Sequence, residues 1–379
     1  MIANLFHELI LVSLNRLDDL STIPTSEGWY NIYDLSKRHT LVGITFWAVQ
    51  KLYKGERESI INLPSELRMK WLGSSALIQS QNDLLNRRCL ELQNILSSNG
   101  CKYCFLKGQG LVELYPKYLL NLRQCGDIDV WIKGGYKKIM SYISTIAYAD
   151  KVTDIHVNLL IFKDVEVEVH FKPAYLSNRI ANNYLQNWFL SEAEIQFANI
   201  SLNGLHVPTN GFNRIYILLH IYRHLFGEGI GLRQIMDMYF VLRSSKFTKV
   251  DKELFEKFKV LTFVQGLNWV MHYMFEPNEK DLSKYEAVGI NKKVGQFLLD
   301  EIMQMGNFGH YDNRFNKFKY ESHFSRFMIM VKAKLRFISY FPQEVFWQPI
   351  DIIRRFFIYR YLRRIRNNNY KKKRLSFCS

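Results

Sequence analysis

The chain has 379 residues, of which 48% are hydrophobic and 15% aromatic. This composition supports a large packed core, excludes a disordered protein and leaves room for two or three domains. The net charge of +16 is uneven, because ten Lys and Arg but no Asp or Glu lie between Ile352 and Ser379. Removing these ten leaves only +6 on the rest of the chain.

Cysteine usage and the N-terminal segment indicate a protein of the reducing cytoplasm. The five cysteines, at positions 89, 101, 104, 125 and 378, are odd in number and scattered, which is typical of free thiols. Cys101 and Cys104 have C-x-x-C spacing, but no second pair follows, so we expect no zinc or redox chemistry there. The first residues lack a basic leader, and charges interrupt every apolar run before it reaches the length of a membrane span. We therefore expect neither a signal peptide nor a transmembrane helix.

Residues 1–98 are predicted to be helical, because apolar residues recur every three or four positions. Pro64 suits the first turn of a long helix, since its fixed φ is compatible with that position. Gly100 suits the position just after the end of the same helix.

A mixed segment follows, in which alternating or apolar runs predict strands and helical spacing predicts helices. In chain order we predict a strand at 101–106, a short helix at 108–115, a strand at 128–132, a helix at 136–147, two strands at 152–162 and 165–171 joined by a hairpin, and helices at 182–197, 213–226 and 232–244. After Pro208 the chain is predicted to be largely helical.

The strand at 128–132 begins with two carboxylates, Asp127 and Asp129, which alternate with Ile128 and Val130. Residues two apart on a strand point to the same face, so both carboxylates project together while the apolar pair faces a core. Two like charges on one face repel each other unless a cation neutralises them. A hard divalent ion such as Mg²⁺, or Mn²⁺, is the natural occupant of such a site.

A later strand offers a further acid for this site. The run from Val165 to His170 alternates apolar residues with Glu166 and Glu168, so both glutamates lie on one face. Three carboxylates on adjacent strands, with a glycine turn nearby for phosphate, form a site for metal-assisted phosphoryl or nucleotidyl transfer. Alternation alone does not choose between Glu166 and Glu168.

The order of these motifs resembles the DNA polymerase β-type nucleotidyltransferase superfamily, and more narrowly a large, mostly uncharacterised bacterial nucleotidyltransferase family. The resemblance covers roughly residues 105–240. It is carried by Leu106-Lys107-Gly108, Leu114-Tyr115-Pro116, Arg123, Gly126-Asp127-Ile128-Asp129-Val130, Glu168-Val169-His170 and the later His220, His224 and Asp237.

The resemblance implies a role for each matching residue. Asp127, Asp129 and Glu168 would hold the metal ions, and Glu168 would also assist deprotonation of the acceptor hydroxyl. Lys107, Gly108, Gly110 and Arg123 would bind the nucleotide phosphates. The remaining matches are His170, His220, His224 and Asp237. They would contact the metal-binding and phosphate-binding residues without binding metal or nucleotide themselves. Two departures from the family pattern are the turn Lys107-Gly108-Gln109-Gly110 and a Glu at position 168, where the family usually has Asp.

Some of these residues have alternative interpretations. His220 and His224 are spaced i and i+4 on one helical face, which could bind Zn²⁺ and would suit a zinc hydrolase. Packing near the cleft, with Asp237 as hydrogen-bond partner, is the other interpretation and the one we favour. Arg123 could instead pair with a local acid, and Lys107 could be solvated.

The C-terminal segment is predicted to form a basic amphipathic helix. From Ile352 to Ile365 apolar residues recur at roughly helical spacing among arginines, and Lys371-Lys372-Lys373-Arg374 follows. The interpretation we favour is that its aromatic residues pack on the protein's own core and leave the arginines exposed. An anionic membrane surface is the second interpretation and nucleic acid the third.

We therefore predict an α+β protein with a small mixed sheet wrapped by helices. The expected regions are 1–98 (helical), 99–210 (catalytic core), 211–345 (helical) and 346–379 (basic tail).

The expected function is Mg²⁺- or Mn²⁺-dependent transfer of a nucleoside monophosphate from a nucleoside triphosphate such as ATP to an unidentified acceptor hydroxyl. The resemblance adds a link to surface-polysaccharide synthesis. The expected location is the cytoplasm or the inner face of the membrane. The alternative is a non-catalytic protein of the same fold that binds membrane or nucleic acid through its tail.

Overall fold

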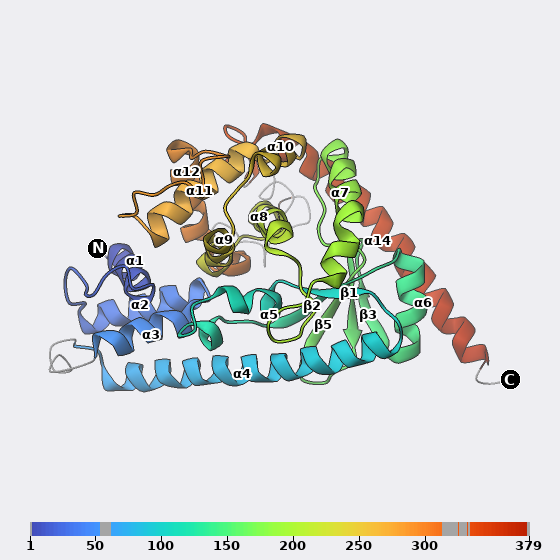
Figure 1. Cartoon of the computed structure of the whole chain (residues 1–379), viewed down its shortest axis with the longest axis horizontal. Helices are drawn as coiled ribbons and strands as arrows, with labels where there is room; N and C mark the ends of the chain where they lie inside the picture. The colour runs from blue at the N-terminus through green and yellow to red at the C-terminus, as the bar shows by residue number, and fades with distance from the viewer. Residues whose placement is uncertain (1, 54–61, 313–324, 326–331, 333, 377–379) are drawn as a thin grey trace.

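The computed structural model describes residues 2–53, 62–312, 325, 332 and 334–376 and shows a mixed α+β protein, as predicted (Figure 1). The α-helices are α1 (Ile2–Ser13), α2 (Ser26–Arg38), α3 (Val42–Leu52), α4 (Ser65–Ser98), α5 (Gly108–Leu111), α6 (Tyr136–Ile146), α7 (Arg179–Ala198), α8 (Asn210–Gly227), α9 (Leu232–Ser244), α10 (Lys249–Lys257), α11 (Leu261–Phe275), α12 (Lys292–Met305) and α14 (Pro342–Ser376). Short 3-10 turns are η1 (Val112–Leu114), η2 (Leu120–Leu122) and η3 (Asn307–Gly309).

The strands of the described residues form one mixed sheet in the order β1-β2-β5-β4-β3. They are β1 (Tyr103–Leu106), β2 (Asp127–Ile132), β3 (Tyr148–Val152), β4 (His156–Leu160) and β5 (Glu166–His170). Strands β2 and β5 run parallel, and the other neighbouring pairs are antiparallel. The parallel pair lies at the centre of the sheet, so the residues that begin β2 and β5 lie side by side.

The two faces of the sheet pack against different sets of helices. Ile128 and Val130 of β2 belong to a hydrophobic cluster with the second half of α4 and with α6, whereas Trp131 belongs to a larger cluster with helices such as α8 and α9. Figure 1 shows α4 beneath the sheet and α8 and α9 above it. The alternation predicted for β2 is therefore confirmed, and its carboxylates lie on the face that looks toward the upper helices.

The long helix α4 begins and ends where the sequence predicts. Pro64 precedes its first residue, and Gly100 follows it with φ of 67°, a left-handed conformation that favours glycine. The amide of Cys101 donates to the carbonyl of Leu96 at 3.0 Å, and that of Gly100 to Ser97 at 2.9 Å, which is the hydrogen-bond pattern of a Schellman motif. The helix spans both hydrophobic clusters, with Trp71 in one and Leu92 in the other.

One predicted strand is wrong. The apolar run at 152–162 forms not one strand but the end of β3 and the whole of β4, separated by a turn. The hydroxyl of Thr153 accepts hydrogen bonds from the amides of Ile155 and His156, which closes this turn. The predicted single helix at 108–115 is likewise split, into α5 and η1.

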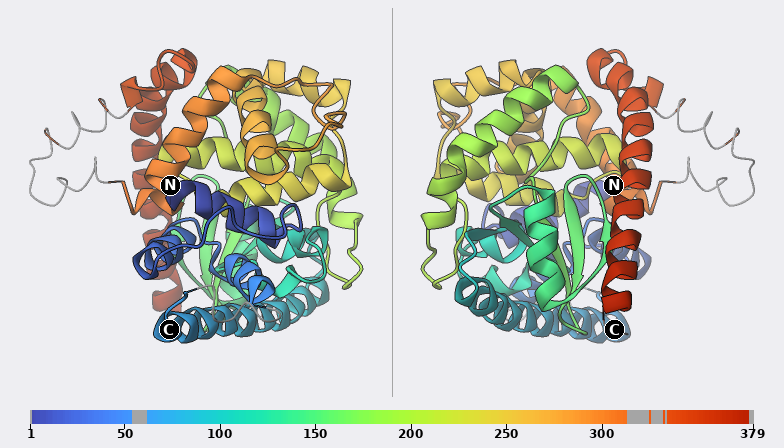
Figure 2. Two further views of the ribbon diagram at one scale, coloured as in Figure 1. Left: turned by 90° about the vertical axis from the view of Figure 1, so that its left-hand side faces the viewer. Right: turned by 90° about the vertical axis from the view of Figure 1, so that its right-hand side faces the viewer.

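The predicted C-terminal helix is present as part of α14, whose side chains are described as far as Arg360; the Lys371–Arg374 cluster and Cys378 lie outside the described side chains. Figure 2 shows α14 running along one side of the molecule, past the sheet. No helix in the described ranges combines the length and hydropathy needed to cross a bilayer. The boundaries at residues 98, 210 and 345 stay a prediction.

Candidate active site

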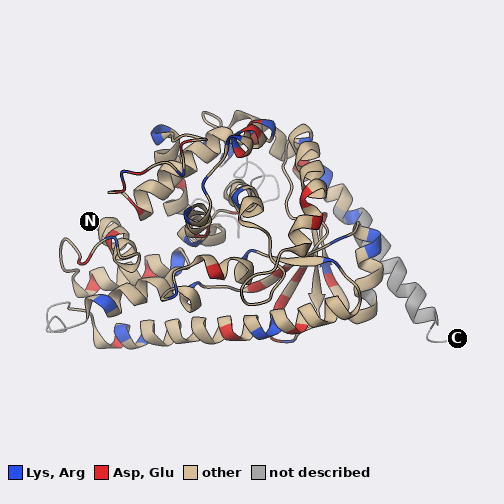
Figure 3. Cartoon of the chain, viewed as in Figure 1, with Lys and Arg blue, Asp and Glu red and all other residues tan. Residues whose placement is uncertain are grey.

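Three carboxylates from two neighbouring strands meet at the centre of the sheet. The parallel register of β2 and β5 pairs Asp129 with Glu168. Asp127 lies two residues before Asp129 on the same face of β2. One oxygen from each of the three side chains lies within 4.8 Å of the other two. Figure 3 shows the acidic residues, in red, on these central strands.

Glu166 is the other acid that strand alternation allowed as the third carboxylate of the site. Its backbone pairs with that of Asp127, yet its side chain is exposed and accepts a hydrogen bond from the amide of Asn158 on β4. Among the described residues it belongs to no group of potential metal ligands. The geometry therefore favours Glu168 as the third carboxylate of the site.

The crowding of negative charge alters the acidity of these groups. The charge of Asp129, together with burial, raises the pKa of Asp127 to about 6. Burial also acts to raise the pKa of Asp129, but the ammonium of Lys107 and a hydrogen bond from His170 outweigh it and hold that pKa below its usual range. At neutral pH the ionised Asp127 is therefore repelled by the neighbouring carboxylates. A bound cation would relieve this repulsion.

Asp129 is the most tightly held of the three carboxylates. Its Oδ1 lies 2.8 Å from Nζ of Lys107 and accepts a hydrogen bond of 2.8 Å from Nε2 of His170. The same His170 nitrogen lies 3.5 Å from Oε2 of Glu168, and Nδ1 of His156 lies 3.6 Å from that oxygen. His170 is thus beside the carboxylates, as expected, and His156 is a neighbour that the sequence reasoning missed.

The turn between β1 and α5 places Lys107 in the pocket. Lys107 and Gly108 have φ of 47° and 37°, a conformation that is strained for the lysine and easy for the glycine. Both residues line the pocket. Gly110 is not among its lining residues; a Cβ there would lie 2.5 Å from the carbonyl oxygen of Phe105, so the chain needs glycine at 110 for close packing.

Arg123 is committed to a buried ion pair. Its Nε and Nη2 each lie 2.7 Å from an oxygen of Asp237, and Nη1 donates to the sulfur of Cys125 at 2.5 Å. The hydroxyl of Tyr115 donates to the same carboxylate at 2.6 Å. Arg123 therefore does pair with an acid, but not with a local one as the alternative had it: the partner is Asp237 on α9, 114 residues away.

The two histidines of α8 face the pocket as neutral groups. The rings of His220 and His224 have their centroids 4.3 Å apart. Burial holds the pKa of His220 well below its usual range and lowers that of His224 to about 4. In the described part of the chain they join no group of three potential metal ligands, so the geometry favours packing beside the cleft over a zinc site. The expected hydrogen bond to Asp237 is wrong, because that carboxylate accepts from Arg123 and Tyr115, while His224 bonds to Arg223.

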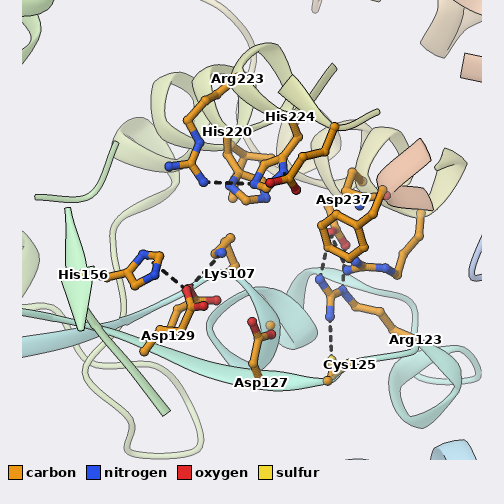
Figure 4. Close-up of a pocket in the computed structure, with 18 residues that line it drawn as sticks. Lys107, Arg123, Cys125, Asp127, Asp129, His156, His220, Arg223, His224 and Asp237 are labelled. Carbon is orange, nitrogen blue, oxygen red and sulfur yellow. Dashed lines mark hydrogen bonds and ion pairs between the residues drawn. The ribbon is translucent and has the colours of Figure 1, made fainter. Parts of the chain in front are cut away.

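Two arginines of the pocket escaped the sequence reasoning. Arg223 lines it between the two histidines of α8 and hydrogen-bonds to His224 at 3.1 Å, and Arg233 lines it from α9, 3.6 Å from Asp237. Figure 4 shows Arg223 above the cavity, with Lys107, Asp127 and Asp129 below it. Helical spacing could have indicated both arginines, because residues three or four apart share a face. Arg223 lies three residues after His220, and Arg233 lies four residues before Asp237.

The pocket therefore has Asp127, Asp129 and Glu168 on the sheet side, and Arg223 and Arg233 beside Glu228 and Asp237 on the helix side. A comparison with protein-family models matches residues 25–276 to the family described as uncharacterised nucleotidyltransferase. Comparisons with curated proteins and with solved structures give no match.

Proposed function

Because the chain belongs to this family of uncharacterised nucleotidyltransferases and is a nucleotidyltransferase, we propose that its pocket moves a nucleoside monophosphate from a nucleoside triphosphate to an acceptor hydroxyl. One observation carries this proposal: three carboxylate oxygens from Asp127, Asp129 and Glu168 lie within 4.8 Å of one another, facing basic residues across the pocket. Such a pocket can hold divalent ions and the phosphates that they bind.

The residues present fit a divalent cation. The donors of Asp127, Asp129 and Glu168 are all carboxylate oxygens, which Mg²⁺ and Mn²⁺ prefer. The pKa of Asp127 is raised because the nearby basic groups do not fully neutralise the negative charge around it. When bound, the ion neutralises phosphate charge and polarises the acceptor oxygen. We propose Mg²⁺, with Mn²⁺ as a substitute.

The basic side chains of the pocket divide into two groups. Arg123 has Asp237 as a counter-ion at two points, so its charge is largely neutralised. Lys107, Arg223 and Arg233 line the same pocket and are the stronger candidates for the triphosphate. We propose that these three bind phosphate, while Arg123 and Asp237 hold the wall of the pocket in place.

Glu168 is the proposed proton acceptor for the hydroxyl group that attacks. Its side chain is partly exposed to the pocket, whereas Asp129 is buried between Lys107 and His170. Burial acts to raise the pKa of Glu168, but His170, His156 and Lys107 together outweigh it and lower that pKa, so the carboxylate is ionised at neutral pH. An ionised carboxylate within reach of the acceptor can take its proton as the new phosphoester bond forms.

The experiment that tests this proposal uses the purified full chain with Mg²⁺, cell lysate and each labelled nucleoside triphosphate in turn. We expect one nucleotide to label an acceptor in the lysate, and we expect no label with Asp127→Asn. Labelling that persists unchanged in this variant would contradict the proposed site. The resemblance to a family met beside surface-polysaccharide genes makes sugar hydroxyls the first acceptors to assay.

The proposed location is the cytoplasmic face of the membrane, because α14 presents its polar side to the protein and an apolar side to solvent. Four polar residues at helical spacing bind the body. Glu344 accepts from Ser177 and Tyr222, Gln348 donates to the carbonyl of Phe226 at 3.0 Å, Asp351 is buried, and Arg355 bonds Asp154 and Tyr175.

The opposite side of α14 carries large apolar residues that nothing covers among the described residues. Phe346, Ile350, Ile353 and Phe357 are 64%, 40%, 61% and 64% exposed. They repeat the four-three-four spacing of the polar set, displaced by two residues, or about 200° around the helix. In the sequence, positions 360, 364, 367 and 371 continue this spacing and are Arg, Arg, Asn and Lys. An apolar stripe that leads into basic residues suits an anionic membrane surface.

A further inference from the structure

A second group of potential ligands adjoins the three carboxylates. The antiparallel register of β4 and β5 pairs His156 with His170. Oε2 of Glu168 lies 3.6 Å from Nδ1 of His156 and 3.5 Å from Nε2 of His170. Ligand atoms held tetrahedrally by one metal, at bonds of about 2.0–2.2 Å, lie roughly 3.3–3.6 Å apart. Both distances from Glu168 therefore match the spacing around a single bound ion, and the ligand atoms of all three residues lie within 4.8 Å of one another.

His156 has a ring nitrogen without a hydrogen-bond partner. Within the described ranges its Nδ1 is shielded from solvent and makes no hydrogen bond, because 3.6 Å to Glu168 is too long for one. An imidazole nitrogen that carries no proton has a lone pair to offer to a metal ion. A buried polar atom without a partner lowers stability, and coordination to a cation would remove this penalty.

We propose that His156, Glu168 and His170 hold a borderline divalent ion of the Zn²⁺ type, next to the all-oxygen position of Asp127 and Asp129. Two imidazoles and one carboxylate form a donor set that suits Zn²⁺, whereas Mg²⁺ prefers oxygen alone. Glu168 belongs to both groups of ligands, so the two ions would share it. This inference rests on the proposed metal-dependent transfer and adds His156 and a second kind of metal to it.

The competing description of the same residues is an ion-pair network without metal. Nε2 of His170 hydrogen-bonds to Asp129 at 2.8 Å, and Lys107 lies at 2.8 Å from the same oxygen. In that arrangement a proton on His170 occupies the position that the proposed ion would take. The ion-pair network predicts no Zn²⁺ binding at these residues, whereas the proposed site predicts it.

The test measures Zn²⁺ affinity of the metal-free full chain by competition with a chromogenic chelator, in excess Mg²⁺. We expect one tight Zn²⁺ per chain, and an affinity that falls at least about tenfold in His156→Ala. His156→Gln, which keeps a polar side chain of similar length, is the second variant should the alanine chain fail to fold. The exposed His310→Ala is the matched control and should bind as the wild type does. Co²⁺ in place of Zn²⁺ should give the visible absorption of a tetrahedral site, lost with His156.

Three outcomes would overturn the inference: no Zn²⁺ bound in excess Mg²⁺, unchanged affinity in the His156 variants, or affinity lost in His224→Ala and retained in His156→Ala. The last would place the ion on the α8 histidines. Failure here is separable from failure of the proposed function. Nucleotide transfer with Mg²⁺ but no Zn²⁺ site would overturn this inference alone, and Zn²⁺ binding without transfer from any nucleotide would overturn the function alone.

Discussion

Arg123 and Asp237 lie 114 residues apart in the chain and form a two-point ion pair, with both nitrogen–oxygen distances at 2.7 Å. Their side chains are only 1% and 6% exposed. The pair joins the loop before β2 to α9, and so holds the arginine-bearing wall of the pocket over the carboxylates.

Removing the acid of this pair should destabilise the protein strongly. Asp237→Asn leaves the guanidinium of Arg123 buried without its counter-ion, and we expect the free energy of unfolding to fall by about 3–5 kcal/mol in urea titrations. The control is Asp34→Asn, which breaks a half-exposed pair with Lys37 and should cost about 0–1 kcal/mol. Equal losses in the two variants would contradict a structural role for the buried pair.

Asp127→Asn should abolish nucleotide transfer without unfolding the protein. The folded-state pKa of Asp127, about 6, lies above its ordinary value of 3.8, so its ionised form destabilises the fold as pH rises through that range. The neutral amide removes this repulsion. In a chelator at about pH 7.5, we expect the variant to unfold at the same urea concentration as the wild type or higher. Turnover at the wild-type rate would contradict the assignment.

Glu168 and Glu166 should differ sharply in a paired substitution. Glu168→Gln removes a carboxylate that lies with Asp127 and Asp129, and we expect transfer to fall by about two orders of magnitude or more. Glu166→Gln changes an exposed side chain bonded to Asn158, so the rate should stay within a few-fold of the wild type. The reverse ranking would show that the strand register assigned to the site is two residues out.

Arg223 should contribute to nucleotide binding. Arg223→Met keeps much of the side-chain length and removes the charge, and we expect KM for the triphosphate to rise roughly tenfold or more. Arg243→Met, an exposed arginine of α9 outside the pocket, is the control and should leave KM unchanged. A similar KM for both variants would place the phosphates elsewhere.

The apolar stripe of α14 should bind anionic vesicles. Replacing Phe346, Ile353 and Phe357 with Ser should reduce co-sedimentation of the full chain with anionic liposomes by about tenfold or more, because their apolar area no longer enters the interface. Since the three side chains are exposed, the fold should be retained, as circular dichroism would verify. Neutral vesicles should bind neither the wild-type chain nor the triple Ser variant.

The control for the stripe uses other exposed leucines. Leu77, Leu190 and Leu202 are 73%, 74% and 97% exposed on other elements, and their joint replacement with Ser should leave vesicle binding unchanged. Equal binding by all three proteins would contradict the membrane proposal. A wild-type dimer that the stripe variant converts to monomer would show instead that a second copy of the chain covers this face.

The local features of this protein were predictable from the sequence. Strand alternation places Asp127 and Asp129 on one face and Ile128 and Val130 on the other, and the structure confirms it. The ends of α4 at Pro64 and Gly100 were likewise predictable. In each case the deciding interaction acts within a few residues of chain.

The partners of these residues needed the tertiary structure. Alternation is satisfied equally by Glu166 and Glu168, and only the parallel register of β2 and β5 sets Glu168 beside Asp129. His156 was missed because residues 152–162 were predicted as one strand, whereas a turn at Thr153 precedes β4 and places His156 at its start. For α14, spacing predicts an amphipathic helix, but the expectation that its apolar side packs on the body is wrong, since Ile353, Phe356 and Phe357 are 61%, 54% and 64% exposed. The hydrogen bonds that Glu344 accepts from Tyr222 and that Gln348 donates to Phe226 decide which side packs. Such contacts depend on the folded positions of residues far apart in the sequence.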